Sequence, residues 1–382
     1  MAPGTTDRQL APDVARGLCL AFIAIANVML YLHGRPYGLR QHILEHTAGD
    51  QIVSFLTVAA VDARIYPLFA VLLGYGIAVQ GSRGHPAHSA RPLRLRGLGL
   101  VVFGAVHGIL LFSGDILGLY GLITIALVPA LRWSDRRLLV WAAVLLVPLS
   151  SVQGLALSDV GPTLQRSILW SIGIADPVEA LLWRVPEWLM GMLGMLGVIP
   201  AALVGIWAGR HNLLALPSSH RRTLGVAGLI GAGVGIGGGL PSAAVLVGIV
   251  PLEAGATAMM ISVIHVITGV IGGLGYASLI GWVCGNARVA SSRAVSSLTA
   301  VGQRSLTCYL LQSVLMVPFL SAWTLAWGAT FGSAEAALFA VGVYLVTMIV
   351  ALLLRRYGDR RPAETLLRDF VSRFDRREPV PA

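Results

Sequence analysis

The sequence predicts an all-α polytopic membrane protein, a bundle of about ten transmembrane helices with both termini in the cytoplasm. The chain of 382 residues is 56% hydrophobic and only 12% charged, a balance that water-soluble domains of this size do not have. Apolar stretches long enough to cross the hydrocarbon core recur along the whole chain. Arginines gather in every second connection between these stretches, which is typical of a multi-pass topology.

Ten apolar stretches have the length of about 17 to 25 residues that a membrane span needs. They cover residues 17–34, 55–80, 97–113, 115–132, 137–157, 186–208, 223–240, 256–283, 298–321 and 334–354. The first lacks a small-residue cleavage pattern, so we expect it to be retained as a span. The seventh repeats Gly231, Gly235 and Gly239 on one helix face, which favours close packing of a neighbour. The Gly- and Pro-containing segment after it is expected to form an outer loop or a short re-entrant piece.

Arginine placement sets the orientation. All 28 basic residues are arginine. With the amino terminus inside, 23 of the 28 fall in cytoplasmic segments, and the five outside are Arg35, Arg40, Arg64, Arg166 and Arg184. This excess satisfies the positive-inside rule for ten spans with both ends in the cytoplasm. The net charge of +10 is therefore explained by orientation in the lipid bilayer, and we expect no binding to nucleic acid.

The chain divides into a transmembrane helical domain, residues 1–354, and a basic tail, residues 355–382. The tail carries eight arginines, and its apolar side chains recur at roughly helical spacing: Leu366, Leu367, Phe370, Val371 and Phe374. This pattern predicts an amphipathic cytoplasmic helix that lies against anionic lipid headgroups. A solvated, partly disordered tail is the alternative. The cysteines Cys19, Cys284 and Cys308 show no metal-type spacing, so we expect neither a disulfide nor a metal site.

The stretch from Gly104 to Tyr120 holds an ionisable ring inside an apolar run. At membrane depth His107 needs a polar partner or a wet cavity, which makes it a functional candidate. Asp115 follows eight residues later, about 12 Å away on a straight helix, so direct contact requires a turn at Ser113-Gly114. His107 could then act as a general base oriented by the carboxylate, in acyl transfer to a hydroxyl or amine. Alternatively, His107 donates to a backbone carbonyl and Asp115 caps the next helix.

The first span offers a second set of polar groups. Arg16 and Asn27 are eleven residues apart, which places them nearly on one helix face and about 16 Å apart. Asp13 lies one turn below Arg16. These residues are either substrate contacts or a membrane-edge ion pair with Asn27 as an interhelical hydrogen-bonding group.

Further polar candidates lie in the second, fourth and ninth spans. Asp62 and Arg64 could hold an anionic or polar substrate near the outer surface, or could anchor the helix end. Tyr120 closes the stretch that contains His107, and Gln312 lies at mid-depth of the ninth span. His265 and Tyr309 also lie at mid-depth, and Glu187 and Glu253 lie near outer ends of their spans. Taken singly, these four residues and Gln312 are structural hydrogen-bonding groups, whereas together they predict a polar interior at the outer half of the bundle. Tyr120 and Gln312 are expected to contact substrate.

Several segments carry a resemblance to a known family. They are DVARG at 13–17 with Asn27, DARIYPLFAVLLGYG at 62–76, RLRGLGLVVFGAVHGILLFSGDILGLYGL at 94–122, VGQRSLTCYLLQSVL at 301–315 and RPAETLLR at 361–368. The chain resembles the YeiB-like family of bacterial membrane proteins, defined by domain of unknown function 418. In the last segment Arg361 stands where that family usually has glycine.

The family is distantly similar to transmembrane acyltransferases. Their heparan-glucosaminide acetyltransferase branch has an arginine early in the first span followed by an asparagine, and Arg16 and Asn27 keep that spacing. The resemblance implies a multi-pass protein of the bacterial inner membrane. It also implies no bound cofactor, an acyl-CoA such as acetyl-CoA as co-substrate on the cytoplasmic side, and an acceptor from the opposite side.

The leading functional hypothesis is an acyltransferase-like enzyme that acts on a small-molecule or lipid substrate. His107 is the general base, Asp115 orients it, and Asn27 polarises the acyl carbonyl. Arg16 lies near the phosphate-bearing end of the donor. The alternative is a transporter or exporter of a small or amphipathic molecule, in which His107, Asp115 and Asp62 couple to protons or bind the cargo. A sensor or scaffold without turnover is a third hypothesis.

Overall fold

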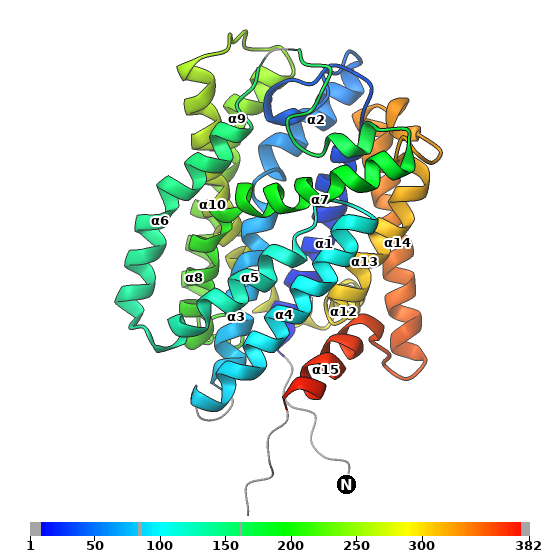
Figure 1. The fold of residues 1–382 in the computed structure, drawn as a ribbon. Helices are drawn as coiled ribbons and strands as arrows, with labels where there is room; N and C mark the ends of the chain where they lie inside the picture. Colours follow the sequence, from blue (N-terminus) through cyan, green and yellow to red (C-terminus); the bar gives the residue numbers. More distant parts are fainter. Residues whose placement is uncertain (1–8, 83–85, 161, 376–382) are drawn as a thin grey trace, which may run out of the picture.

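The computed structural model describes residues 9–82, 86–160 and 162–375, and these residues form an all-α bundle (Figure 1). Within them, β-structure is limited to isolated bridges of Tyr37 with Ile43 and Thr163. Eight helical segments in this part of the chain are long and apolar enough to cross a membrane. Two shorter apolar segments, Leu117–Arg132 and Ser305–Leu320, accompany them. The predicted class, an all-α polytopic membrane bundle, is confirmed.

The first half of the chain forms the helices that surround the interior. They are α1 (Leu10–Tyr31), η1 (Leu39–Gln41), α2 (Ala48–Ala60), α3 (Ile65–Gly81), α4 (Pro86–Leu110), α5 (Leu117–Leu127), η2 (Val128–Arg132), α6 (Asp135–Ala156), η3 (Trp170–Gly173) and α7 (Pro177–Gly194). The second half completes the bundle. It contributes η4 (Leu196–Val198), α8 (Ile199–Arg210), α9 (Arg221–Leu246), α10 (Ala256–Cys284), α11 (Ala287–Ala290), α12 (Arg293–Gly302), α13 (Ser305–Leu320), η5 (Trp327–Ala329), α14 (Ser333–Arg356) and α15 (Pro362–Phe374).

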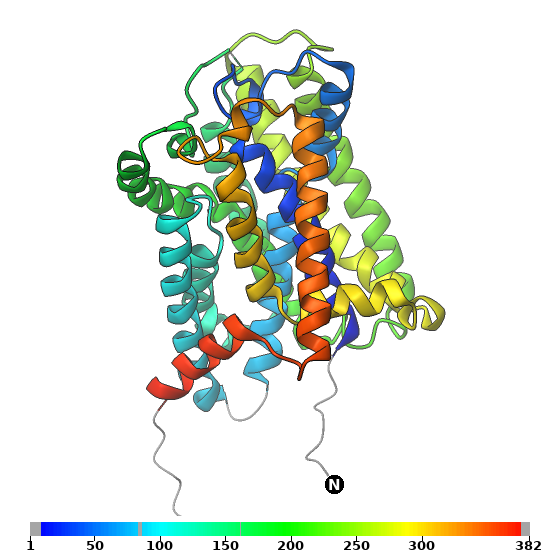
Figure 2. The same ribbon diagram turned by 90° about the vertical axis from the view of Figure 1, so that its right-hand side faces the viewer.

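Three predicted segments differ in detail from the structure. The stretch 55–80 is divided between α2 and α3 by a turn at residues 61–64. The stretch 186–208 is not one straight span, because α7 lies across the bundle and α8 runs along it (Figures 1 and 2). Pro200, which has no N–H to donate, sits in the first turn of α8 and favours a new helix start there. The outer loop expected over residues 237–255 is shorter than predicted, because α9 continues through Pro241 to Leu246 and only residues 247–255 form an irregular connection.

Glycines bring α9 and α10 into close contact. A Cβ atom on Gly231 would lie 2.7 Å from the Cα of Gly275, and one on Gly235 would lie 2.6 Å from the Cα of Gly272. The predicted small-residue face of α9 is therefore real, since only glycine allows the two backbones to approach this closely.

The connections sort to the two ends of the bundle. α1 begins at the end where α15 lies, and the turns at 132–135 and 211–220 lie there too, as does the segment 285–304, which contains α11 and α12 (Figures 1 and 2). The segments 32–47, 157–160 and 162–176 lie at the opposite end (Figure 1). We call these the α15 end and the opposite end. Assignment of the α15 end to the cytoplasm stays a prediction that depends on the arginines.

The tail is not separate from the bundle where the structure describes it. α15 packs against α4 and α13, with Ala363 and Leu367 buried. The last residues of the predicted tail, 376–382, and the first residues of the predicted transmembrane domain, 1–8, lie outside the described part of the chain.

Candidate active site

The turn after α4 brings His107 and Asp115 together. α4 ends at Leu110, where the N–H groups of Leu111 and Phe112 both donate to the carbonyl of His107, at 2.9 and 3.0 Å. The chain then reverses before α5. As a result, His107 Nδ1 lies 2.8 Å from Asp115 Oδ1. The turn that direct contact required is present.

Asp115 fills both roles that the sequence left open. Its Oδ2 accepts a hydrogen bond from the backbone N–H of Gly118 at 2.8 Å, so the carboxylate caps α5 while it holds His107. The indole Nε1–H of Trp188, on α7, also donates to Oδ2, at 3.3 Å. Hydrogen bonds from three separate elements therefore fix the carboxylate, and its side chain is fully buried.

The close approach of α4 and α5 depends on Gly104. A Cβ atom at this position would lie 2.2 Å from the backbone nitrogen of Gly118 and 2.6 Å from Asp115 Oδ2. Any side chain at residue 104 would therefore meet both the cap of α5 and the carboxylate that holds His107.

Ser313 completes a hydrogen-bonded chain. Its Oγ lies 2.8 Å from His107 Nε2. Because the carboxylate of Asp115 accepts a hydrogen bond from Nδ1–H, Nε2 is the acceptor for the Ser313 hydroxyl. Ser313, His107 and Asp115 are 3%, 2% and 3% exposed. This order of hydroxyl, imidazole and carboxylate is the arrangement that activates a nucleophile in acyl transfer.

Ser313 was missed from the sequence. The available signal was its position next to Gln312, one helical turn after Tyr309, in the family-like segment 301–315. A serine in an apolar helix is too common to single out without the contact to His107, which joins residues 206 positions apart.

A cavity of about 600 Å³ lies between α1, α3, α4, α5, α13 and α15. Ile116, Tyr120 and Tyr309 are among the residues that line it. Tyr309 connects the cavity to the hydrogen-bonded chain, because its ring centroid lies 5.0 Å from that of His107. Its hydroxyl also accepts a hydrogen bond from the backbone N–H of Ile116 at 3.4 Å. One layer of side chains therefore separates the cavity from His107.

Charge and apolar surface are both present in the cavity. Four arginines and two carboxylates line it: Arg16, Arg96, Arg361, Arg368, Asp13 and Glu364. Asp13 pairs with Arg16 at 3.0 Å, and the arginines remain in excess. Elsewhere the lining is aromatic and aliphatic, with Phe69 stacked on Tyr120 at 5.2 Å between ring centroids. Such a combination suits a ligand with phosphate groups at one end and an apolar chain at the other.

The predicted site residues divide into two groups. Asp13, Arg16 and Tyr120 line the cavity. Asn27 lies just behind the wall: its Oδ1 accepts from the hydroxyl of Tyr66 at 3.0 Å, and the backbone carbonyl of Tyr66 accepts from the hydroxyl of Tyr120 at 2.8 Å.

Gln312 is placed between helices. Its Nε2 donates to the backbone carbonyl of Leu20 at 3.1 Å, which ties α13 to α1, and the residue does not line the cavity described above.

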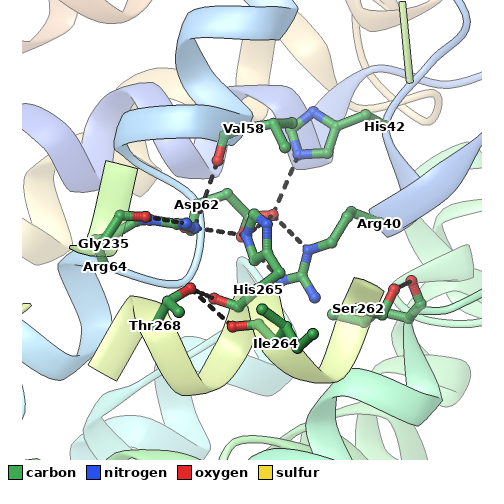
Figure 3. A network of polar contacts seen from close by, with 11 residues as sticks. Arg40, His42, Val58, Asp62, Arg64, Gly235, Ser262, Ile264, His265 and Thr268 are labelled. Atoms are coloured by element: carbon green, nitrogen blue, oxygen red, sulfur yellow. Dashed lines mark hydrogen bonds and ion pairs between the residues drawn. The ribbon is translucent and has the colours of Figure 1, made fainter. Parts of the chain in front are cut away.

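Asp62 and Arg64 belong to a different polar network (Figure 3). Asp62 Oδ2 accepts from Nε of Arg40 at 2.8 Å. Arg64 is fully buried, and its Nη2 donates to the backbone carbonyl of Gly235 at 2.7 Å. Neither Asp62 nor Arg64 lines the cavity, so the structure separates this pair from His107.

Two of the arginines predicted on the outer side satisfy helix ends. Arg184 Nη1 donates to the backbone carbonyls of Leu110 and Ile109, at 3.0 and 3.3 Å, and so satisfies the last carbonyls of α4. Arg166 does the same for α1 through the carbonyls of Met29 and Leu30. A cation at a helix carboxyl end is favourable, and Arg184 thereby fixes the end of the helix that carries His107.

Comparison with known proteins gives a family but no activity. The model of a family described as "Protein of unknown function (DUF418)" matches residues 208–373. The uncharacterized protein YxaH of Bacillus subtilis (strain 168) is 26% identical over 145 residues. That match covers 36% of this chain and 36% of the relative, so the similarity spans about a third of either protein. No solved structure matches the chain. Ser313 and Arg368 lie inside the family match, whereas His107 and Asp115 lie outside it.

Proposed function

The chain belongs to the DUF418 family of proteins of unknown function, and from that premise we propose that it is a membrane acyltransferase-like enzyme. It moves an acyl group from a thioester donor on the cytoplasmic side to a hydroxyl or amine acceptor. The observation that carries the proposal is the hydrogen-bonded chain of Ser313, His107 and Asp115, one layer of side chains from a cavity lined by four arginines.

In the first step Ser313 Oγ attacks the thioester carbonyl carbon while its proton passes to His107 Nε2. The carbon–sulfur bond breaks, the departing thiolate takes that proton, and an acyl-serine is left. In the second step His107 Nε2 takes the proton of the acceptor. The acceptor attacks the acyl-serine carbonyl, and Ser313 Oγ leaves with the proton. Asp115 holds the Nδ1–H and stabilises the imidazolium formed in each step.

Other residues support the two ends of the donor. Arg16, Arg96 and Arg368 supply guanidinium groups for the phosphates of an acyl-CoA such as acetyl-CoA. Because the amide oxygen of Asn27 accepts from Tyr66, the amide NH2 is the group by which Asn27 would stabilise a developing oxyanion. The donor's acyl end must pass Tyr309 to reach Ser313, so a side-chain shift of Tyr309 is part of the proposal.

The test is turnover of acetyl-CoA by the purified full chain in detergent. Release of free thiol and a mass increase on the peptide that contains Ser313 are expected for the wild type. Ser313→Ala and His107→Ala are expected to abolish both. Ser305→Ala is the matched control, since Ser305 belongs to the same helix, α13, and lies two turns before Ser313. Equal turnover by His107→Ala contradicts the role given to the histidine.

A transporter is separated by a second measurement. Proteoliposomes that show counterflow of a cargo without chemical change, together with no thiol release from acetyl-CoA, would replace the enzymatic proposal. Absence of both activities in the wild type, under conditions where the protein is folded, would favour a sensor or scaffold.

A further inference from the structure

A second polar cluster lies where the turn between α2 and α3 meets α10 (Figure 3). We call it the Asp62 cluster; its members are Arg40, His42, Asp62, Arg64 and His265. Arg40 binds Asp62 through Nε at 2.8 Å and through Nη2 at 3.3 Å. Nε2 of His42 and Nε2 of His265 lie 3.8 and 3.7 Å from Asp62 Oδ2. The proposed acyl transfer uses none of these residues.

The Asp62 cluster has more positive than negative charge. It contains two arginines and one carboxylate. Arg40 is 3% exposed, and Arg64 and His265 are fully buried. Arg64 has no carboxylate contact within hydrogen-bonding distance among the described residues and donates instead to backbone carbonyls and to His265. Burial of an uncompensated charge is costly, so the cluster is short of an anion.

Hydrogen-bonding geometry adds a second, independent observation. Arg64 Nη1 can only donate, and it lies 2.6 Å from His265 Nε2. Nε2 is therefore the acceptor, and the ring proton of His265 is on Nδ1. Nδ1 of His265 and Nη1 of Arg40 are both buried without a hydrogen-bond partner in the described part of the chain. A buried donor without an acceptor is unfavourable, and both atoms here are donors.

The backbone that presents these groups is strained. Arg40, Gln41 and Ala63 have φ of 62°, 60° and 60°, a left-handed conformation that is unfavourable for a non-glycine residue. Arg40 is thus held in an unfavourable conformation, and so is Ala63, which lies between Asp62 and Arg64 in the chain. Strain of this kind persists where surrounding structure enforces it, often at binding sites.

We propose that the Asp62 cluster binds a small oxyanion, a carboxylate or phosphate group, through Arg40 Nη1 and His265 Nδ1. The two side chains lie close together, because Arg40 Nε and His265 Nε2 are 2.8 and 3.7 Å from the same oxygen, Asp62 Oδ2 (Figure 3). Two buried N–H donors with an excess positive charge match an acceptor-only, negatively charged group. The Asp62 side chain is 19% exposed, so the cluster is not sealed inside the bundle. The site is distinct from the cavity next to His107 and does not depend on the proposed acyl transfer.

The test uses the full chain in a maltoside detergent, with thermal unfolding followed by tryptophan fluorescence. Sodium acetate and inorganic phosphate are titrated separately, and sodium chloride holds the ionic strength constant. The wild type is expected to show a saturable rise in its unfolding midpoint with at least one of the two anions. Short-chain phosphatidic acid, titrated in the same way, separates a lipid headgroup from a free anion: a rise with this lipid alone assigns the site to a headgroup phosphate.

Variants decide whether the Asp62 cluster is responsible. Arg40→Gln and His265→Leu are expected to weaken binding at least tenfold, while His265→Asn, which keeps an N–H near the Nδ1 position, retains more of it. Arg166→Gln is the matched control, because Arg166 is also buried and donates to backbone carbonyls of α1. No saturable rise in the wild type with acetate, phosphate or phosphatidic acid overturns the proposal, as does an undiminished rise in Arg40→Gln. If Arg40→Gln does not fold, equal binding by His265→Leu and His265→Asn overturns it.

Discussion

Replacement of Gly104 by alanine tests the geometry on which the candidate active site depends. The new Cβ would lie 2.2 Å from the backbone nitrogen of Gly118 and 2.6 Å from Asp115 Oδ2. Both distances are far below van der Waals contact, and one of the two atoms is backbone. α4 and α5 must therefore move apart, and the hydrogen bond from Gly118 to Asp115, 2.8 Å long, is lost or lengthened.

The expected destabilisation is the sum of opposing effects. Overpacking of a close-packed contact costs about 1–3 kcal/mol, and loss of one hydrogen bond adds about 1 kcal/mol. Alanine in place of glycine inside a helix stabilises the folded state by about 0.5–1 kcal/mol through its higher helix propensity. We expect the free energy of unfolding to fall by about 1–3 kcal/mol. Gly342→Ala, on α14, provides the control, because a Cβ there meets no atom within 4 Å.

Denaturant unfolding in detergent, followed by tryptophan fluorescence, measures both variants. Gly342→Ala should be as stable as the wild type or gain about 0.5–1 kcal/mol from helix propensity. Gly104→Ala should be less stable and should also release less thiol from acetyl-CoA, because Asp115 no longer holds His107 in position. A Gly104→Ala protein as stable as Gly342→Ala would refute the close approach of α4 and α5.

Three further perturbations follow from the same structure. Asp115→Asn puts an amide where His107 needs an acceptor, so the ring adopts the other tautomer and thiol release should fall about ten-thousandfold; unchanged turnover would contradict the orienting role. Glu364→Ala removes the carboxylate that accepts from the N–H groups of Leu306 and Thr307, at 2.8 and 3.2 Å. The free energy of unfolding should fall by about 0.5–2 kcal/mol, as it does on loss of a helix cap. α15 should also become susceptible to limited proteolysis, whereas alanine at an exposed residue of α15 should leave its proteolysis unchanged. The third perturbation is His33→Gln. Burial lowers the pKa of His33, and neighbouring arginines lower it by a smaller amount.

The sign of the His33 effect follows from its depressed pKa. The unfolded chain, with a histidine pKa of about 6.5, binds more protons at His33 than the folded chain does. The contribution of His33 to the free energy of unfolding is therefore fully present above that pH and is lost as the pH falls below it. Unfolding midpoints measured between pH 7.5 and pH 5 should decrease more steeply for the wild type than for His33→Gln; equal slopes would exclude His33 as a contributor.

The sequence specified the chemistry of the His107 site better than its geometry. An ionisable residue in an apolar run requires a partner whatever the fold, so His107 and Asp115 could be found by residue type. Whether they touch depends on the turn between α4 and α5, which the local sequence permits but does not enforce. Ser313 could not be found, because a contact between residues 206 positions apart leaves no trace in the periodicity of either helix.

The direction in which a helix runs through the bundle could not be predicted from the sequence either. A helix that lies across a bundle and one that spans it are equally apolar, so hydropathy alone merged part of α7 with α8. The polar residues of α7 carry the distinguishing pattern: Arg184, Glu187 and Trp188 share one face and are buried, whereas Leu182 and Leu189 are 68% and 50% exposed. That pattern becomes informative only when the partners of the buried face, among them Asp115, are known.

The tail shows that an amphipathic pattern predicts a covered apolar face but does not predict what covers it. An apolar helix face must be covered, and lipid and protein satisfy it equally well. In the structure Leu367 is 2% exposed, and a Cβ on Gly99 of α4 would lie 2.5 Å from its Cδ1, so α4 accommodates α15. Leu366 and Phe374 stay 62% and 54% exposed, which leaves contact with headgroups as a prediction for that side. Since Arg361 and Arg368 line the cavity, the same packing gives the tail a place in the proposed donor site.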